Sequence, residues 1–320
     1  MWKPQSRWII ALVSVALVAW GSAPAYGQRL ARPVPQGGQQ WEVVTGVESA
    51  DKAVQVLKFY PATITVNVGD TITWTNPTSE IHTVTFLAPG QSRPRFDLND
   101  PQQAEPQGDG RLDGSHYLNS GILQAGQQQS WTVTAARPGT YQYICLVHEK
   151  QLGTVVVNPA GTPYPRTAAE YAAERAEAEP LIAMWQQRLA AYQPTVRERA
   201  DGTHEYVING GMGDGIVAVM RFQPQTVDIQ VGDTVIRDNL DSETPHTVTF
   251  GPLQGPPEQV WGDPRAFDGT TPLNSGYFGP AWPAGETYAV TFTAPGQWPY
   301  ICILHAPMLM LGTVNVAPRG

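Results

Sequence analysis

Two cysteines and four of the six histidines in this 320-residue chain belong to a pattern of side chains that occurs twice. Each copy has one histidine 63 or 56 residues before its cysteine and a second histidine three residues after it. The two sets are His82, Cys145 and His148, followed by His246, Cys302 and His305. One thiolate and two imidazoles, with a weak fourth ligand, form the trigonal site that holds copper for electron transfer. The sequence therefore predicts two copper ions, one for each copy.

The sequence around these donors also recurs. Each upstream histidine begins the pentapeptide His-Thr-Val-Thr-Phe, at 82–86 and 246–250, and each cysteine follows Tyr-Ile. A disulfide between Cys145 and Cys302 is the alternative, because exported proteins with an even number of cysteines usually oxidise them. Such a bridge would have to join the same corner of two repeats. The joint recurrence of cysteine and histidines therefore favours two separate metal sites.

The repeat extends beyond the metal donors. Val-Gly-Asp-Thr occurs twice, Leu-Asn-Ser-Gly occurs twice, and residues 52–59 correspond to 215–222. Two copies indicate two homologous domains, because a solenoid needs at least three repeats. Each copy spans about 120 residues, a normal size for one domain. We expect domain 1 at residues 38–158, a linker at 159–201 and domain 2 at 202–320.

Within each copy, apolar residues alternate with polar ones. Ile64, Val66 and Val68 are separated by Thr65 and Asn67, and Gly-Asp or Pro-Gly pairs interrupt such runs. Period-two alternation between turn residues is typical of short strands in a sandwich. The sequence therefore predicts an all-β fold.

One position in these strands differs between the copies. Trp74 in the first copy corresponds to Arg237 in the second. A buried guanidinium without a partner is costly. We therefore expect Arg237 to face solvent or to pair with Asp238 or Asp241.

The linker at 159–201 has a different composition from both copies. It begins with a Pro- and Gly-rich stretch, after which Thr167 and Glu170 form a capping box that starts an Ala/Glu-rich helix. Pro180 is expected to break or kink this helix. A second helix is expected at 181–192, with an apolar stripe made of Leu181, Met184, Trp185, Leu189 and Tyr192. The segment is either a spacer packed on one sandwich or a strut between two coppers.

The amino-terminal segment predicts a secretory signal. Lys3 and Arg7 precede the apolar stretch 8–20, and small residues up to Gly27 provide a cleavage site. The stretch is shorter than the roughly 20 residues of a membrane helix. We expect residues 1–27 to be a signal peptide of a periplasmic or extracellular protein without a membrane span after cleavage. An uncleaved signal would leave a membrane anchor.

The charge of the chain limits its partners. The formal net charge is −8, and removal of Lys3 and Arg7 with the signal would make it −10. The sequence has no basic run, which argues against nucleic acid, since phosphate binding requires clustered Lys and Arg. An acidic surface could steer a basic redox partner, although modest negative charge also serves solubility.

Both copies resemble the plastocyanin/azurin family of cupredoxins. The family pattern is V-x-x-G-D-T-V-T-W, an H-T-V strand, S-G-x-L-x-x-G, P-G-x-Y-x-Y-x-C-x-x-H and a final G-x-V-x-V. The first copy matches nearly all of it from Val66 to Val157, and the second matches from Ile229 to Val316 without the tryptophan. The resemblance implies two Greek-key β-sandwiches, each with one copper near one end. It also implies an electron carrier whose exposed loop histidines, His148 and His305, are the electron exits.

The resemblance suggests different fourth ligands in the two copies. In the second copy, Met310 lies five residues after His305 and two before Gly312, as in a plastocyanin loop, and Met308 is the alternative. In the first copy, Gln151 occupies the position that methionine has in members with a short loop. An amide oxygen is a harder donor than a thioether and favours Cu(II), so we expect the first site to have the lower potential. The alternative is that the first site no longer binds copper.

Three classes of function use such sites. An electron-transfer protein needs only the donors described above. A multicopper oxidase or nitrite reductase would need further histidines, in His-x-His pairs or directly beside the type 1 cysteine, but only His116 and His204 remain. A module for copper storage, delivery or sensing would use the same donors, and only redox cycling with a partner would distinguish it. We therefore predict an electron carrier rather than an enzyme, acting with a redox partner protein.

Overall fold

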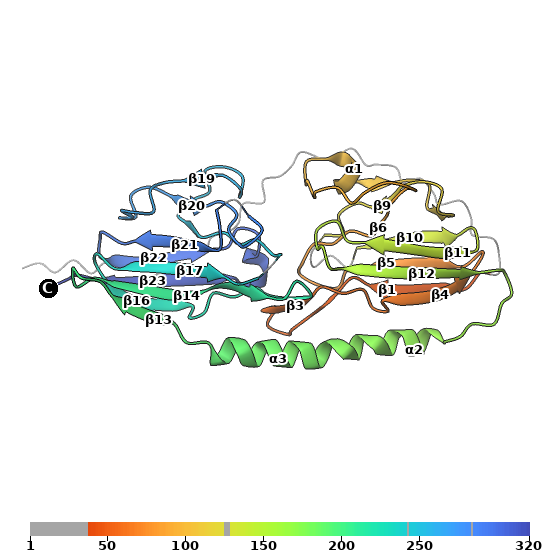
Figure 1. Cartoon of the computed structure of the whole chain (residues 1–320), viewed down its shortest axis with the longest axis horizontal. Helices are drawn as coiled ribbons and strands as arrows, with labels where there is room; N and C mark the ends of the chain where they lie inside the picture. The colour runs from red at the N-terminus through yellow and green to blue at the C-terminus, as the bar shows by residue number, and fades with distance from the viewer. Residues whose placement is uncertain (1–37, 125–128, 242, 283) are drawn as a thin grey trace, which may run out of the picture. The chain divides into compact units, whose positions relative to one another are not determined.

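A computed structural model describes residues 38–124, 129–241, 243–282 and 284–320 (Figure 1). The predicted signal peptide at 1–27 lies outside the described residues. Four β-sheets account for most of the regular structure in these ranges, and the helices are few. The prediction of an all-β fold with two sandwiches is confirmed.

The first copy of the repeat forms two sheets that enclose one core. The sheet β1-β5-β10-β8 consists of β1 (Gln40–Val44), β5 (Thr71–Thr75), β10 (Ser130–Ala135) and β8 (Arg111–Leu112). The sheet β4-β12-β11-β6-β9-β7 consists of β4 (Thr63–Asn67), β12 (Leu152–Asn158), β11 (Gly139–Ile144), β6 (Thr85–Phe86), β9 (Leu118–Ser120) and β7 (Pro106–Gln107). The short helix α1 (Pro101–Ala104) precedes β7. Alternate residues of β12 are buried, as the period-two pattern predicts.

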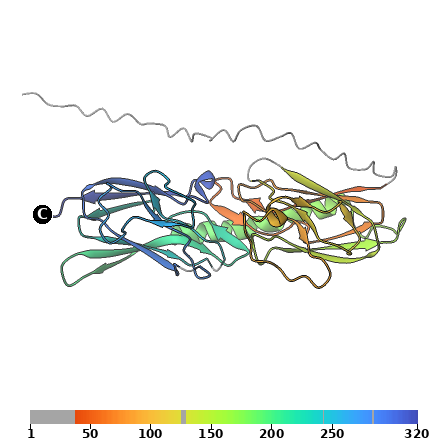
Figure 2. The same cartoon turned by 90° about the horizontal axis from the view of Figure 1, so that it is seen from above.

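The second copy repeats this arrangement. One sheet has the order β16-β23-β22-β18-β20-β19, with β16 (Thr226–Gln230), β23 (Leu311–Ala317), β22 (Gly296–Ile301), β18 (Thr249–Phe250), β20 (Leu273–Ser275) and β19 (Val260–Trp261). The other contains β14 (His204–Gly213), β17 (Thr234–Asn239) and β21 (Thr287–Thr291), and β13 (Thr195–Glu198) pairs with β14. The turn η2 (Ala306–Met308) lies before β23, and the chain ends shortly after that strand (Figure 2).

The repeated Val-Gly-Asp-Thr segment forms a turn that links strands of different sheets. Gly69 has φ of +97° and its counterpart in the second copy has +94°, a conformation that glycine adopts without strain. The carboxylate of Asp70 accepts hydrogen bonds from the backbone N–H of Asn67 at 2.8 Å and from the indole of Trp41 at 3.0 Å. Asp233 accepts backbone hydrogen bonds in the same way. The aspartate therefore fixes the turn from within the core.

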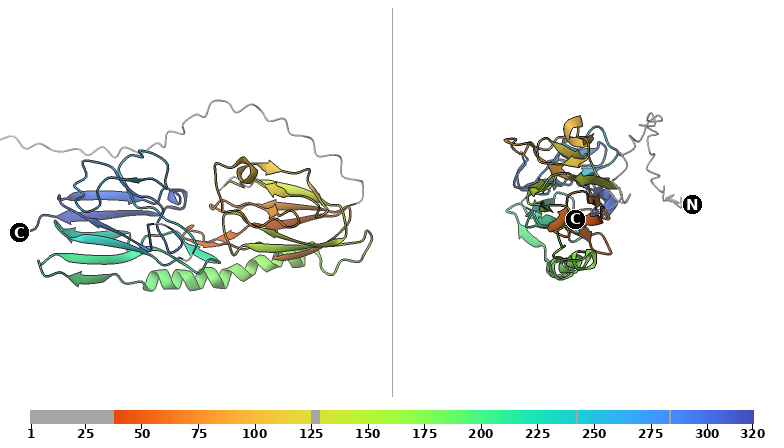
Figure 3. Two further views of the ribbon diagram at one scale, coloured as in Figure 1. Left: turned by 45° about the horizontal axis from the view of Figure 1, so that its top comes forward. Right: turned by 90° about the vertical axis from the view of Figure 1, so that its right-hand side faces the viewer.

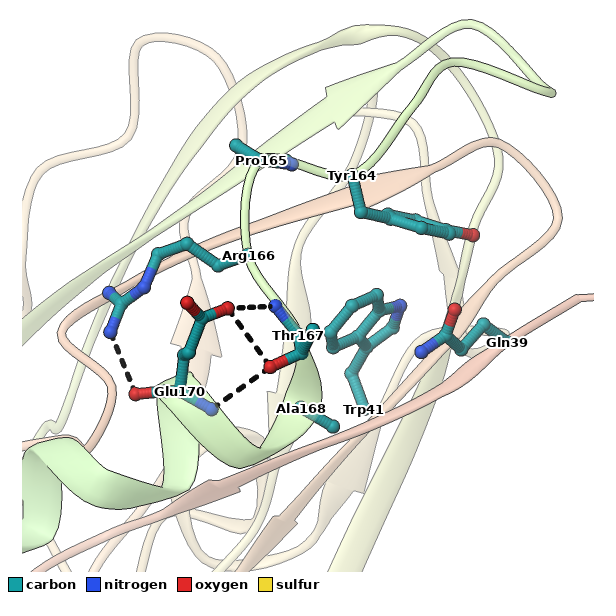
Figure 4. Close-up of a pocket in the computed structure, with 8 residues that line it drawn as sticks. All are labelled: Gln39, Trp41, Tyr164, Pro165, Arg166, Thr167, Ala168 and Glu170. Atoms are coloured by element: carbon teal, nitrogen blue, oxygen red, sulfur yellow. Dashed lines mark hydrogen bonds between the residues drawn. The ribbon is translucent and has the colours of Figure 1, made fainter.

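The linker contains the predicted helices, with the break earlier than expected. Thr167 and Glu170 form the capping box of α2 (Ala168–Ala173), beside a hollow of about 310 Å³ that also borders Trp41 (Figure 4). The turn η1 (Glu174–Glu177) then joins α3 (Ala178–Ala191). Pro180 lies in the first turn of α3, where proline is tolerated. None of the helices in the described ranges is long and apolar enough to span a membrane.

The apolar face of α3 differs in one residue from the predicted stripe. Trp185 is buried and Leu181, Leu189 and Tyr192 are partly buried, but Met184 is exposed. The partners of this face are Val54 and Val56 of β3 (Val54–Val56) together with Met212, Val217 and Val219 of the second copy. The helix therefore packs on residues of both copies rather than on one sandwich (Figure 3).

The two copies share a sheet. The sheet that contains β14 continues through β15 (Val217–Val219), which pairs with β14, to β3 and then β2 (Val47–Glu48) of the first copy. The pairing of β3 and β15 is antiparallel, with Val54 opposite Val219 and Val56 opposite Val217. A small apolar cluster, made of Leu57, Ala218, Met220 and Met308, lies between the copies. All described residues belong to one compact unit.

The expectation for Arg237 is wrong. Its side chain is fully buried and forms an ion pair with neither Asp238 nor Asp241. The guanidinium carbon lies 4.3 Å from the ring centre of Tyr300 and 5.5 Å from that of Phe250. The electron-rich faces of aromatic rings attract the cation where no carboxylate is available.

Candidate metal centres

Each cysteine lies just beyond the end of a central strand. Cys145 follows β11 and Cys302 follows β22, and the loop after each cysteine leads into the last strand of its copy. A backbone hydrogen bond of 3.0 Å closes each loop, from Cys145 N to the carbonyl of Gln151 and from Cys302 N to the carbonyl of Met310. The loops thus place Gln151 and Met310 at equivalent positions, directly before β12 and β23.

The upstream histidines approach these cysteines from the neighbouring strand. His82 precedes β6 and forms a bridge with Leu123, and His246 precedes β18 and forms a bridge with Phe278. In the described part of the chain there are two groups of donor atoms, and within each group all the atoms lie within 4.8 Å of one another. They are His82, Cys145 and His148, and His246, Cys302 and His305. The structure therefore brings together all six residues that the sequence grouped.

In the first centre, the inward-facing atoms form a compact set. Cys145 Sγ lies 3.6 Å from His148 Nδ1, and Gln151 Oε1 lies 2.9 Å from His82 Nδ1. The amide nitrogen of Gln151 donates to the carbonyl of Thr45, which turns the amide oxygen toward the histidine. Gln151 is fully buried. Its oxygen is therefore in place to act as a fourth donor.

In the second centre, both histidines also present Nδ1. Cys302 Sγ lies 3.3 Å from His305 Nδ1 and 3.8 Å from His246 Nδ1, and the two nitrogens are 3.0 Å apart. Met310 is fully buried in the same apolar core as Cys302. Met308 instead packs in the small cluster between the copies. This placement favours Met310 over Met308 as the fourth donor.

Burial keeps the histidines neutral and the thiols protonated when no metal is bound. It lowers the pKa of His82 to about 4 and that of His305 to about 3, and holds the pKa of the other two histidines well below the ordinary value. Burial also raises the pKa of Cys302 to about 11 and raises that of Cys145. The imidazoles can bind a metal at neutral pH without losing a proton, whereas each thiol must lose one.

Residues that the sequence analysis did not select complete the surroundings of each centre. The backbone N–H groups of Thr83 and Thr247 donate to the cysteine sulfurs at 3.4 and 3.3 Å. Thr78 Oγ1 lies 3.3 Å from His82 Nε2. Hydrogen bonds to sulfur and to the outer nitrogen of a histidine tune a metal site and orient its ligands. Thr83 and Thr247 belong to the repeated pentapeptide, so its recurrence already pointed to these two residues.

The predicted exits are not at the surface. His148 is only 6% exposed and His305 only 4% exposed. Their Nε2 atoms face one carboxylate, that of Glu80, with Oε1 4.0 Å from His148 and Oε2 3.6 Å from His305. Burial, with a contribution from the nearby Glu48, raises the pKa of Glu80 to about 7. The exposed exits implied by the family resemblance are therefore absent from the described structure.

The two remaining histidines belong to neither centre. His116 lies near Asp109 and Asp113, and His204 lies near Asp233. Both side chains are about one-third exposed. The described structure thus adds no histidine to either donor set.

Comparisons with known proteins agree with this donor chemistry. The family model described as copper binding proteins, plastocyanin/azurin family, matches residues 44–158 and 211–317. Amicyanin of Paracoccus denitrificans is 27% identical over 146 residues, which are 46% of this chain and 92% of amicyanin. Two solved structures of amicyanin mutants, one in the Cu(I) form and one oxidised, are 26% and 24% identical. Each match covers 40% of this chain and 89% of the amicyanin chain, with a TM-score of 0.25.

Proposed function

Because the chain belongs to the plastocyanin/azurin family of copper-binding proteins, we propose that it transfers electrons through two type 1 copper centres, one in each copy. The observation that carries this proposal is the pair of buried donor sets, each with one cysteine sulfur and two imidazole nitrogens within 4.8 Å of one another. This donor set fits copper, which in blue-copper sites takes two histidines, one cysteine and a weak axial ligand. The similarity to amicyanin supports a copper-binding electron-transfer module.

The chain supplies a fixed, dry environment for this chemistry. Copper, when bound, gains or loses one electron. The donors of each centre lie at or between the ends of neighbouring strands of one sheet, β6, β11 and β12 in the first copy and β18, β22 and β23 in the second, so the surroundings would need little rearrangement when the charge changes. The N–H groups of Thr83 and Thr247 donate to the sulfurs, and neither sulfur is exposed.

The fourth donors give the two centres different affinities for the electron. The amide oxygen of Gln151 favours Cu(II), whereas the thioether of Met310 tolerates Cu(I). The first centre should therefore have the lower potential, and a single electron should settle on the second.

We also propose that the protein is exported and works with a redox partner protein. The predicted signal supports export, and the net charge of −8 fits a basic partner better than an acidic one or a nucleic acid. The placement of His116 and His204 supports an electron carrier rather than a multicopper enzyme. Turnover of dioxygen or nitrite by the copper-loaded protein would contradict that assignment.

The test is copper content together with the absorption spectrum of matched variants. The wild-type protein should bind two coppers, each with intense thiolate-to-copper absorption. Cys145→Ser and Cys302→Ser should each remove one absorbing centre and leave the other. Loss of both centres in either variant would show one shared site and would refute two independent ones. Failure of the loaded protein to cycle between Cu(I) and Cu(II) with redox mediators would instead favour storage or delivery.

A further inference from the structure

The loop histidines of the two centres meet inside the molecule. Each presents Nδ1 to its own cysteine and Nε2 to Glu80 of the first copy, and both are almost fully buried. A partner protein therefore cannot contact the imidazole edges of His148 and His305. Of the described side chains, Glu80 is the one recorded within ion-pair distance of both Nε2 atoms.

Glu80 is held in a defined orientation between them. Its side chain is 8% exposed, and Oε1 accepts a hydrogen bond of 2.9 Å from the backbone N–H of Ile81. Oε2, which faces His305, has no hydrogen-bond partner among the described residues. A buried carboxylate oxygen without a partner is costly. The orientation of Oε2 toward His305 therefore does not come from a hydrogen bond that stabilises the carboxylate.

The second copy has no such carboxylate. Asn76 donates to the backbone carbonyl of Glu80, and Asn239 donates in the same way to that of Thr244, so Glu80 and Thr244 are equivalent. Each lies two residues before the upstream histidine of its copy. One copy alone therefore provides the group that lies between the centres.

We propose that the two centres exchange an electron with each other inside the molecule, through the contact His148–Glu80–His305, and that Glu80 is the residue that couples them. This inference rests on the proposed function. The two imidazole rings and the carboxylate are almost fully buried, and the carboxylate oxygens lie 4.0 and 3.6 Å from the Nε2 atoms of the two donor sets. The protein would then be an internal electron relay, and outside partners would bind at other parts of its surface.

The exchange step is balanced without further reactants. With both centres loaded, one electron would leave a copper held by Cys145, which would change from Cu(I) to Cu(II), and would reach a copper held by Cys302, which would change from Cu(II) to Cu(I). No bond is formed or broken and no proton moves. The lower potential expected from Gln151 sets this direction.

Contacts between the copies keep this path fixed. The strands β3 and β15 pair, and Met308, three residues after His305, packs against Leu57 of the first copy. Lys150, two residues after His148, lies 3.3 Å from Glu243 of the second copy. Both ligand loops are thus attached to the opposite copy.

The test is flash reduction of the fully copper-loaded protein with less than one electron per molecule. Reduction by the photoreductant depends on concentration, whereas exchange between the centres does not. The wild-type protein should show a concentration-independent phase in which the first absorption band returns while the second bleaches. Glu80→Thr, which copies Thr244, should slow that phase at least tenfold. Glu80→Gln retains one acceptor oxygen and should give an intermediate rate.

Control measurements separate a loss of electron exchange between the centres from a change in the copper sites themselves. In Glu80→Thr the copper content and both absorption bands should match the wild type, since Glu80 is not proposed as a ligand. Both potentials are measured as well, because a group beside the outer nitrogen of a ligand histidine can shift them, and the rates are compared at the measured potential difference. Cys145→Ser and Cys302→Ser assign the bands and should lack the phase. Equal rates in wild type and Glu80→Thr would overturn the inference. Loading of only one copper would refute the two-centre proposal itself, whereas two loaded coppers without a concentration-independent phase would refute only the relay.

Discussion

Replacing Arg237 by methionine should stabilise the protein. The guanidinium is fully buried, and its one recorded hydrogen bond runs from Nη1 to the carbonyl of Val235 at 3.2 Å. Nε and Nη2 have no partner among the described residues. The compensation comes from the rings of Tyr300 and Phe250.

The expected size follows from these contacts. A desolvated cation over an aromatic ring gains about 2 kcal/mol, and one hydrogen bond from a charged group gains about 1.5–3 kcal/mol. Against this, each unpaired buried donor costs about 1–3 kcal/mol, and removing the ion from water costs several more. Apolar replacements of buried ions are often stabilising by about 1–4 kcal/mol. We expect Arg237→Met to raise the free energy of unfolding by about 1–3 kcal/mol.

Urea unfolding of the metal-free protein measures this change. The midpoint should rise in Arg237→Met at an unchanged slope. The matched control is Trp74→Arg, which places the cation at the equivalent, fully buried position of the first copy and should destabilise the protein by several kcal/mol. If Arg237→Met were less stable than the wild type by more than about 1 kcal/mol, the guanidinium would be net stabilising and the reasoning would fail.

The fourth donors should control the reduction potentials of the two centres. In redox titrations, Gln151→Met should raise the potential of the first centre and Met310→Gln should lower that of the second. Equal potentials in the wild-type protein would contradict the assignment. Gly211→Ala should weaken copper binding at the second centre alone, because its Cβ would lie 2.2 Å from His246 Cδ2; Gly46→Ala, whose Cβ would lie 3.4 Å from the His82 ring, is the milder control in copper titrations. At pH 8, copper binding should release about one proton per ion, from the cysteine, because the pKa values of the histidines are already low. Apparent affinity should then rise about tenfold per pH unit, and calorimetry in buffers of different ionisation enthalpy that showed no proton release would disprove the thiol assignment.

The donor sets were predictable because their signals are local and repeated. Cys145 and His148 lie on one loop, the upstream histidine belongs to a recurring pentapeptide, and the chemistry of copper restricts which residues can combine. The choice of Gln151 rested on the family resemblance, in which members with a short loop have methionine at this position. The binding of two coppers and the fourth donors themselves stay predictions.

The burial of the loop histidines was not predictable in this way. The family resemblance implies an exposed loop histidine in each copy, whereas in this chain contacts between residues far apart in the sequence attach both ligand loops to the opposite copy. Glu80 carried no such signal, because the segment around it does not recur: Ser79 and Ile81 correspond to Glu243 and Pro245, just as Glu80 corresponds to Thr244. Its meaning depends on the arrangement of the copies.

The error for Arg237 has a different cause. Loss of solvation does disfavour a buried guanidinium, but aromatic rings as well as carboxylates can compensate for that loss. Tyr300 and Phe250 lie on other strands, so the sequence near Arg237 did not show the rings that accept it. Pairing preferences of a buried cation depend on the whole core rather than on neighbouring residues.

The pairing of β3 with β15 has a consequence for the origin of the molecule. In the repeat, Val54 corresponds to Val217 and Val56 to Val219, yet Val54 lies opposite Val219 and Val56 opposite Val217. Val54 thus pairs with the counterpart of Val56, and Val56 pairs with the counterpart of Val54. This reciprocal pairing is the rule of an isologous contact in a twofold dimer. A single copy, cut from the chain, would carry an edge complementary to that of its own twin.

An ancestor with one copy could therefore have formed a homodimer with two identical centres face to face. Joining two genes for such a protein would preserve the contact and end the requirement that both halves mutate together. From then on, one half could acquire glutamate where the other has threonine, and glutamine where the other has methionine. In this way, fusion would have turned a symmetric pair of centres into a pair whose two members differ.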